Sequence, residues 1–142
     1  MKTKNELKAT KESFKQIDFS QGLPVTNFHA AGIDVGDSKN DVAVSNGKNG
    51  FIVREYPTFT ADLINLVSWL LSLSITTVAM ESTGIYWLNL YLLLEEAGIE
   101  PYLVNAKHVK NVTGRKKDDT DAIWLQKLHS CGLLQKSFQP DG

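Results

Sequence analysis

The stretch AAGIDVG at residues 30–36 decides the fold, because an apolar run bounded by glycine predicts a buried β-strand. Two more strands are predicted over residues 40–45 and 51–56, separated by the turn sequence NGKNG at residues 46–50. Together the three segments predict an antiparallel meander at the start of the domain.

Helical and strand patterns alternate downstream of this meander. The predicted elements are a helix that begins at Thr60 or Asp62 and runs to Leu71, a strand over 75–80, a helix capped by Ser82, Thr83 and Gly84 that ends at Glu96, a strand over 101–105, and a helix over 119–131. This order combines a meander with parallel βα units. We therefore expect an α/β domain with a mixed five-stranded sheet and helices on its faces, which is the element order of the ribonuclease H-like fold.

Length and composition are those of one soluble globular domain, with 142 residues of which 42% are hydrophobic and 22% charged. We expect residues 29–142 to form this domain and residues 1–28 to be a basic and polar N-terminal extension. The single cysteine, Cys131, argues against a disulfide scaffold and favours a reducing compartment. The start of the chain lacks the pattern of a signal peptide, and polar residues interrupt the uncharged stretch 63–80, so we expect a cytoplasmic protein without a membrane span.

Charge is segregated along the chain, although the formal net charge is only −1. Residues 18–106 carry three basic and ten acidic side chains, whereas residues 107–117 carry five basic side chains and no acidic one. A basic run beside acidic residues suits a site that holds both cations and a polyanion, and a solvated charged loop is the alternative. The basic residues of this run are Lys107, Lys110, Arg115, Lys116 and Lys117.

Four carboxylates lie where a purely structural role does not require them. Asp34 is inside the most apolar strand, where an unpaired buried charge is costly. Glu81 follows a predicted strand, and open α/β sheets bind ligands at the carboxyl ends of parallel strands. Asp118 and Asp121 have the i, i+3 spacing that predicts a shared face at the start of the last helix. The alternative for each residue alone is a turn cap or a helix-start acid.

Clustered carboxylates repel one another and need cations, and a set of oxygen ligands favours Mg²⁺ or Mn²⁺. Two such ions about 4 Å apart activate an attacking oxygen and stabilise the leaving oxygen of a phosphodiester in nucleases. The basic run before Asp118 would then bind the phosphate backbone. The sequence thus predicts metal-dependent chemistry on nucleic acid.

Four ordered motifs resemble the N-terminal domain of DEDD-type insertion-sequence transposases, the relatives of the Piv DNA invertase, whose domain is similar to the RuvC Holliday-junction resolvase. They are GIDVG at residues 32–36, MESTGIY at 80–86, LVNAK at 103–107 and KKDDTDA at 116–122. The resemblance covers roughly residues 29–140 and implies that Asp34, Glu81, Asp118 and Asp121 are a metal-binding and catalytic tetrad. It also implies DNA as the substrate, a homo-oligomer in full-length members and a structured guide RNA in some of them.

The chain departs from the family pattern in two respects. Lys117 occupies the position before the third carboxylate, where the family usually has threonine. Full-length members also continue into a second domain that resembles one supplying a serine nucleophile, so the chain reads as a fragment. Because Ser82 is the one serine near the proposed metals and is predicted to cap a helix, we expect residues 1–142 not to perform recombination alone.

Three other functions remain open at this point. GIDVGDSK at residues 32–39 resembles the first phosphate loop of sugar kinases and actin-like ATPases, although the second loop and second lobe of such proteins are not found. A free-standing junction-resolving nuclease and a non-catalytic nucleic-acid-binding module are the others. The three histidines have no metal-ligand spacing. The large aromatic residues are predicted to be core, namely Trp69, Trp87, Trp124, Tyr86 and Tyr91.

Overall fold

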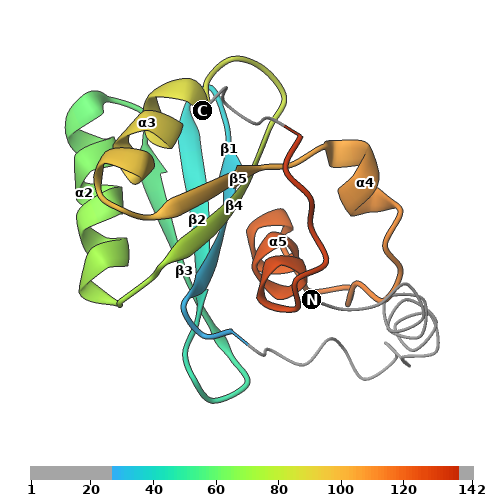
Figure 1. Ribbon diagram of the computed structural model, residues 1–142. Helices are drawn as coiled ribbons and strands as arrows, with labels where there is room; N and C mark the ends of the chain where they lie inside the picture. The colour runs from blue at the N-terminus through green and yellow to red at the C-terminus, as the bar shows by residue number, and fades with distance from the viewer. Residues whose placement is uncertain (1–26, 138–142) are drawn as a thin grey trace, which may run out of the picture.

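A mixed five-stranded sheet in the order β3-β2-β1-β4-β5 forms the centre of the molecule (Figure 1). The computed structural model describes residues 27–137, so nearly all of the predicted extension over residues 1–28 lies outside the described residues. The strands are β1 (Ala30–Val35), β2 (Lys39–Ser45), β3 (Phe51–Pro57), β4 (Thr77–Ser82) and β5 (Glu100–Leu103). The helices within the described residues are α2 (Thr60–Ser72), α3 (Leu88–Glu96), α4 (Ala106–Lys110) and α5 (Asp121–Ser130).

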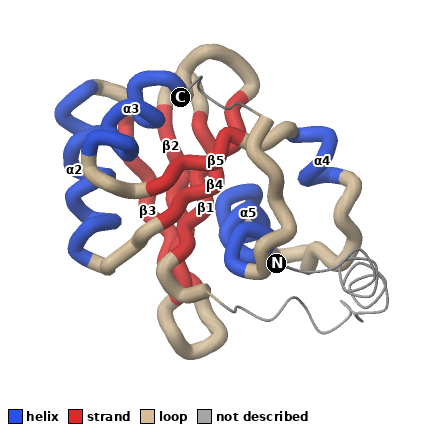
Figure 2. The backbone as a smooth tube through the Cα atoms, in the orientation of Figure 1, coloured by secondary structure: helices blue, strands red, loops and turns tan. Residues whose placement is uncertain are grey.

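The predicted topology is confirmed. β3, β2 and β1 pair antiparallel as a meander, while β1, β4 and β5 pair parallel. Helices α2 and α3 cover one face of the sheet and α5 packs on the other (Figure 2). The sheet is therefore the middle layer of three, as an α/β sequence pattern with buried parallel strands requires.

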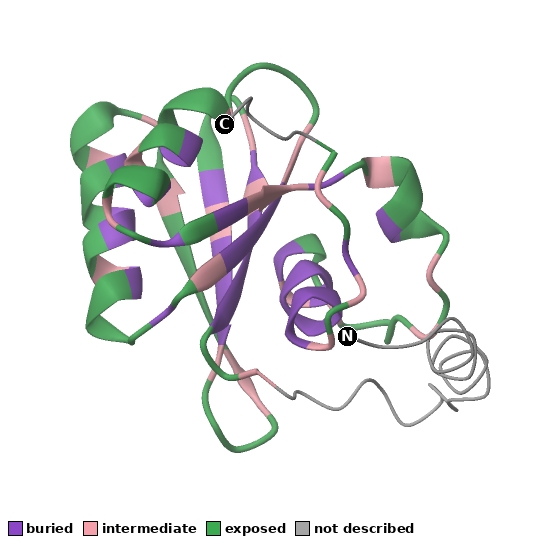
Figure 3. Ribbon diagram, in the orientation of Figure 1, coloured by how far each residue is buried: buried purple, intermediate pink, exposed green. Residues whose placement is uncertain are grey.

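Each face of the sheet has its own apolar cluster, because successive side chains of a strand point to opposite faces. On one side Ile33 and Met80 pack with Leu66 of α2 and Leu90 of α3. The other side holds Ala79 of β4, with Trp124, Leu125 and Leu128 of α5. Figure 3 shows β1 and β4 largely buried and α5 buried along most of its length.

Helix α5 lies against β1 with almost no space between the two backbones. A Cβ atom on Gly32 would overlap the carbonyl oxygen of Ala122 and the amide nitrogen of Gln126, and would lie 2.9 Å from the Cβ of Leu125. Gln126 also donates from Nε2 to the carbonyl oxygen of Ala30 at 3.1 Å. Residue 32 must therefore be glycine for the helix to approach this closely.

The far end of α5 is fixed by His129, which is buried against β4. The Thr77 hydroxyl donates to the carbonyl oxygen of Glu100 at 3.1 Å, so it accepts a hydrogen bond from Nε2 of His129 at 2.7 Å. Burial lowers the pKa of His129 to about 4, which keeps its ring neutral near pH 7. His129 is thus a structural residue, in agreement with its lack of metal-ligand spacing.

Two predictions about helix starts are wrong, and one helix was not predicted. Helix α3 begins at Leu88, because the Ser82 side chain bonds to the backbone of Gly84 within its own turn and does not cap a helix. Helix α5 begins at Asp121, where Thr120 caps it through the Ile123 amide, so Asp118 is not on this helix. Helix α4 was not predicted, because five residues are too few for a periodic pattern.

The predictions for the aromatic residues are confirmed with one exception. Tyr91 and Trp124 are buried, and Trp69 and Trp87 pack partly buried against the first cluster. Tyr86 is 54% exposed, because it lies in the turn before α3 rather than on a helical face. Among residues 27–137 no helix is both long and apolar enough to cross a membrane.

The close approach at Gly32 generates a stability prediction. Gly32→Ala should lower the free energy of unfolding by about 1–3 kcal/mol, because α5 must move away from the sheet to admit the methyl group. Denaturant unfolding monitored by circular dichroism measures this loss. Gly84→Ala is the matched control, since its Cβ would meet only the Tyr86 ring, at 3.4 Å. Equal stability of the two variants would contradict the packing described for α5.

Candidate active site: an acidic cavity with its own counter-ions

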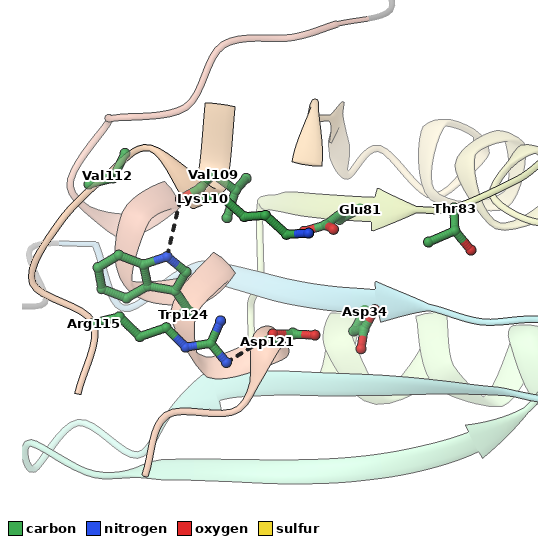
Figure 4. A pocket seen from close by; sticks show the side chains of 9 residues that line it. All are labelled: Asp34, Glu81, Thr83, Val109, Lys110, Val112, Arg115, Asp121 and Trp124. Atoms are coloured by element: carbon green, nitrogen blue, oxygen red, sulfur yellow. Dashed lines mark hydrogen bonds and ion pairs between the residues drawn. The ribbon is translucent and has the colours of Figure 1, made fainter. Parts of the chain in front are cut away.

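A cavity of about 360 Å³ opens at the carboxyl ends of β1 and β4 (Figure 4). Acidic, basic and apolar side chains from four parts of the chain line it. The lining residues are Asp34, Glu81, Thr83, Val109, Lys110, Val112, Arg115, Asp121 and Trp124.

Three carboxylates meet in this cavity because of how the strands and α5 are arranged. Asp34 and Glu81 are partners in the parallel ladder of β1 and β4, so their side chains leave the same face of the sheet side by side. Helix α5 crosses this face with Gln126 at Ala30 and Ala122 at Gly32, which brings its first residue, Asp121, to the same end of the strands. Figure 4 shows the Asp121 carboxylate pointing toward Asp34.

Two cationic side chains share the cavity with these carboxylates. Lys110 ends α4, which packs on α5 through Val109, whose carbonyl oxygen accepts a hydrogen bond from Trp124 Nε1 at 3.4 Å. The Lys110 side chain extends toward Glu81 (Figure 4). Arg115 places Nη2 2.9 Å from Oδ1 of Asp121. The cavity thus contains two internal counter-ions for three acids.

The turn before α5 is anchored by Asp119, which the predicted helix over 119–131 placed at its first residue. Its carboxylate accepts from Nζ of Lys127 at 2.7 Å and from the amide of Lys116 at 3.3 Å. The side chains of Lys127 and Asp119 are only 7% and 9% exposed. The Asp119–Lys127 pair could not be predicted from spacing, because no simple rule links residues eight positions apart. The usable signal in the sequence was Lys127 itself, a lysine on the face of α5 that turns toward the sheet.

Burial and mutual repulsion shape the acid strengths in the cavity. The pKa of Asp34 is raised, first by burial and then by the negative charges of Asp121 and Asp41. The pKa of Glu81 is also raised by burial, then by Asp121 and Asp34, while Lys110 and Arg115 act in the opposite direction. Asp41, which faces Asp34 across the β1–β2 ladder, was not singled out from the sequence. A cation in this cavity would relieve the repulsion.

The structure brings together three of the four predicted carboxylates. Asp34, Glu81 and Asp121 line the cavity, whereas Asp118 is exposed in the turn before α5 and is not among the lining residues. Of the five basic residues, Lys110 and Arg115 line the cavity, and Lys107, Lys116 and Lys117 are exposed on α4 or on the segment that follows it.

The donor chemistry of the cavity fits Mg²⁺ or Mn²⁺. Its acidic ligands are all oxygens, and the repulsion that raises the pKa of both Asp34 and Glu81 favours a bound cation. Within residues 27–137, however, no three His, Cys, Asp or Glu side chains are grouped as a ready-made metal site. Arg115 instead accompanies Asp121. Mg²⁺ is commonly held by one or two carboxylates together with water, so Asp34 and Glu81 can serve as protein ligands in this cavity.

Fold and cavity together define an α/β domain of the ribonuclease H-like class, with acidic side chains at the carboxyl ends of its central strands. The profile of the DEDD transposase family of the IS110 type matches residues 31–142, and the chain belongs to this family. Family membership implies DNA as the substrate and, in general terms, dependence on divalent metal. None of the curated proteins is significantly similar to the chain.

The electrostatics of Asp34 generate a pH prediction for the metal-free protein. Because its folded-state pKa is raised, the ionised carboxylate lowers stability above that pKa, and the penalty disappears as the pH falls below 3.8. Asp34→Asn should therefore unfold at a higher temperature than the wild type at pH 7 with chelator present, and at nearly the same temperature near pH 3. The exposed Asp37 in the β1–β2 turn supplies the control Asp37→Asn, which should show no such difference. A lower melting temperature for Asp34→Asn at pH 7 would assign Asp34 a structural role.

Proposed function

We propose that this chain is the metal-dependent, nuclease-like domain of a DNA transposase, acting on DNA phosphodiesters during recombination. The observation that carries the proposal is the convergence of Asp34, Glu81 and Asp121 from three separate elements in one cavity that also contains Lys110 and Arg115. Such a mixture of acids and cations suits a metal-bound polyanion better than it suits a neutral ligand.

The charged residues that line the cavity each have a role in this proposal. Asp34 and Glu81 hold divalent cations, Mg²⁺ or Mn²⁺, from the sheet, and Asp121 holds them from α5. Asp118 completes the tetrad by the family motif, and this role requires its exposed side chain to reorient toward the cavity. When bound, two such ions supply activation of an attacking oxygen and stabilisation of the leaving oxygen. Lys110 and Arg115 orient the phosphate.

The nucleic-acid path extends from the cavity along the exposed basic residues of α4 and the following segment. Lys107 lies on α4, and Lys116 and Lys117 are exposed before α5. Lys110 and Arg115 line the cavity, and we propose that they form a basic rim beside it together with these three residues. We propose that this rim binds the DNA backbone on either side of the reacting phosphate. By the family resemblance we further propose a structured guide RNA and a second copy of the chain as partners.

The kinase-like alternative has less support from the β1–β2 turn. A phosphate loop needs free backbone amides, and here the Gly36 amide donates to the carbonyl oxygen of Lys39 at 3.0 Å. A Cβ on Gly36 would also lie 2.7 Å from that oxygen, so the glycine serves a tight turn. No comparable observation favours a nucleotide over DNA.

Metal binding tests the proposed function directly. Isothermal titration calorimetry with Mn²⁺ and no nucleotide should detect binding to the wild type, and Asp34→Asn and Glu81→Gln should each reduce its affinity at least about tenfold, since each removes a charged ligand. Asp37→Asn, on the exposed turn, is the control and should bind as the wild type does. Binding that needs ATP, or that survives both substitutions, would refute the proposed site.

Salt dependence tests the proposed DNA path. Affinity for a duplex oligonucleotide should fall with a log–log slope of about −0.9 per phosphate contact, and Lys117→Glu should weaken binding and make the slope shallower by about 0.9. Lys48→Glu makes the same charge change in the β2–β3 turn, at the opposite end of the strands from Asp34, and should leave the slope unchanged. Identical slopes for wild type and Lys117→Glu would show that Lys117 belongs to a solvated loop.

A further inference from the structure

Arg115 pairs with Asp121, one of the carboxylates that would hold the proposed metal ion. Its Nη2 atom lies 2.9 Å from Oδ1 of Asp121, and Figure 4 shows its guanidinium beside the Asp121 carboxylate within the cavity. The same side chain donates from Nε at 3.2 Å and from Nη2 at 2.8 Å to the carbonyl oxygen of Asp119. The guanidinium is therefore held in one orientation by two partners of the turn.

The turn that orients Arg115 is itself fixed. Asp119 is paired with Lys127 inside the protein, and its carboxylate also accepts from the Lys116 amide. The carbonyl of Asp119 is thereby presented to Arg115 on a rigid base. By contrast, the side chains of Arg115 and Asp121 are 41% and 57% exposed, so their ion pair is the replaceable contact of this turn.

A divalent cation and a guanidinium compete for one carboxylate. Both are positive, so they repel each other at contact distance. Each also takes from the other the carboxylate as an acceptor. Asp121 becomes fully available to a metal only when Arg115 leaves it.

We propose that Arg115 is an exchangeable counter-ion that occupies Asp121 until a divalent cation displaces it, and that the released guanidinium then binds a DNA phosphate. This inference rests on the proposed function. It makes Arg115 a positioning residue that couples the two ligands: metal binding frees the guanidinium for DNA, and DNA binding removes a competitor of the metal. By linkage, each ligand then raises the affinity for the other by the same factor.

Mn²⁺ affinity in the absence of DNA, measured by calorimetry, tests the competition. Arg115→Gln should bind Mn²⁺ roughly two- to fivefold more tightly than the wild type, because the ion no longer has to break an exposed ion pair. Lys39→Gln is the matched control. It makes the same charge change on a residue that acts electrostatically on Asp34 but pairs with Asp41 and Glu55 outside the cavity. A gain as large in Lys39→Gln would attribute the effect to net charge and overturn the inference.

A second measurement tests the coupling to DNA. Saturating Mn²⁺ should increase the affinity of the wild type for a duplex oligonucleotide, and Arg115→Gln should reduce this increase and make the salt slope shallower by about 0.9 in the presence of Mn²⁺. Equal Mn²⁺ affinity of wild type and Arg115→Gln would overturn the counter-ion role while leaving the proposed metal site intact. If neither folded protein bound Mn²⁺, the proposed function would fail, and the inference with it.

Discussion

The close backbone contact between Gly32 and α5 is the constraint on which the rest of the structure depends. It sets the height and direction of α5 over β1, because no side chain separates Gly32 from Ala122 and Gln126. The second apolar cluster closes around this contact with Trp124, and the hydrogen bonds of Gln126 and His129 hold the helix along its length. From this packing follows the place of Asp121 beside the carboxyl ends of β1 and β4.

The packing of α5 on the sheet brings together both the acids that repel one another in the cavity and the cations that reduce this repulsion. Partial burial of Asp34 and Glu81 penalises their charged forms, and the approach of Asp121 adds repulsion. Lys110 and Arg115 offset part of that repulsion. The apolar contact of α4 with α5 positions Lys110, and the turn anchored by Asp119 positions Arg115. A domain of a transposase family thus folds with the charge of its acidic cluster already partly compensated.

Sequence reasoning succeeded where hydrophobic periodicity was long and unambiguous. The meander, the parallel β4 and β5, and α2 are present in the predicted order, since β1, β2, β4 and α2 bury apolar residues in the first cluster. Strand β4 spans Thr77–Ser82 rather than the predicted 75–80, so Glu81 lies within the strand. It failed where short polar segments had alternative hydrogen bonds. Ser82 turned to Gly84, Thr120 capped α5 in place of an earlier residue, and α4 was too short to leave a pattern.

The sequence by itself determined the class of fold, the family motifs and the identity of the acids that can form a site. Asp34 and Glu81 were predictable as neighbours, because both follow from strand order and from the rule that parallel strands present ligands at their carboxyl ends. Only the tertiary structure decided that Asp121 lines the cavity while Asp118 stays in the exposed turn, and that Asp119 pairs with Lys127. The physical reason is that these three acids lie within four residues, where spacing is uninformative and partners distant in sequence select the direction of each side chain.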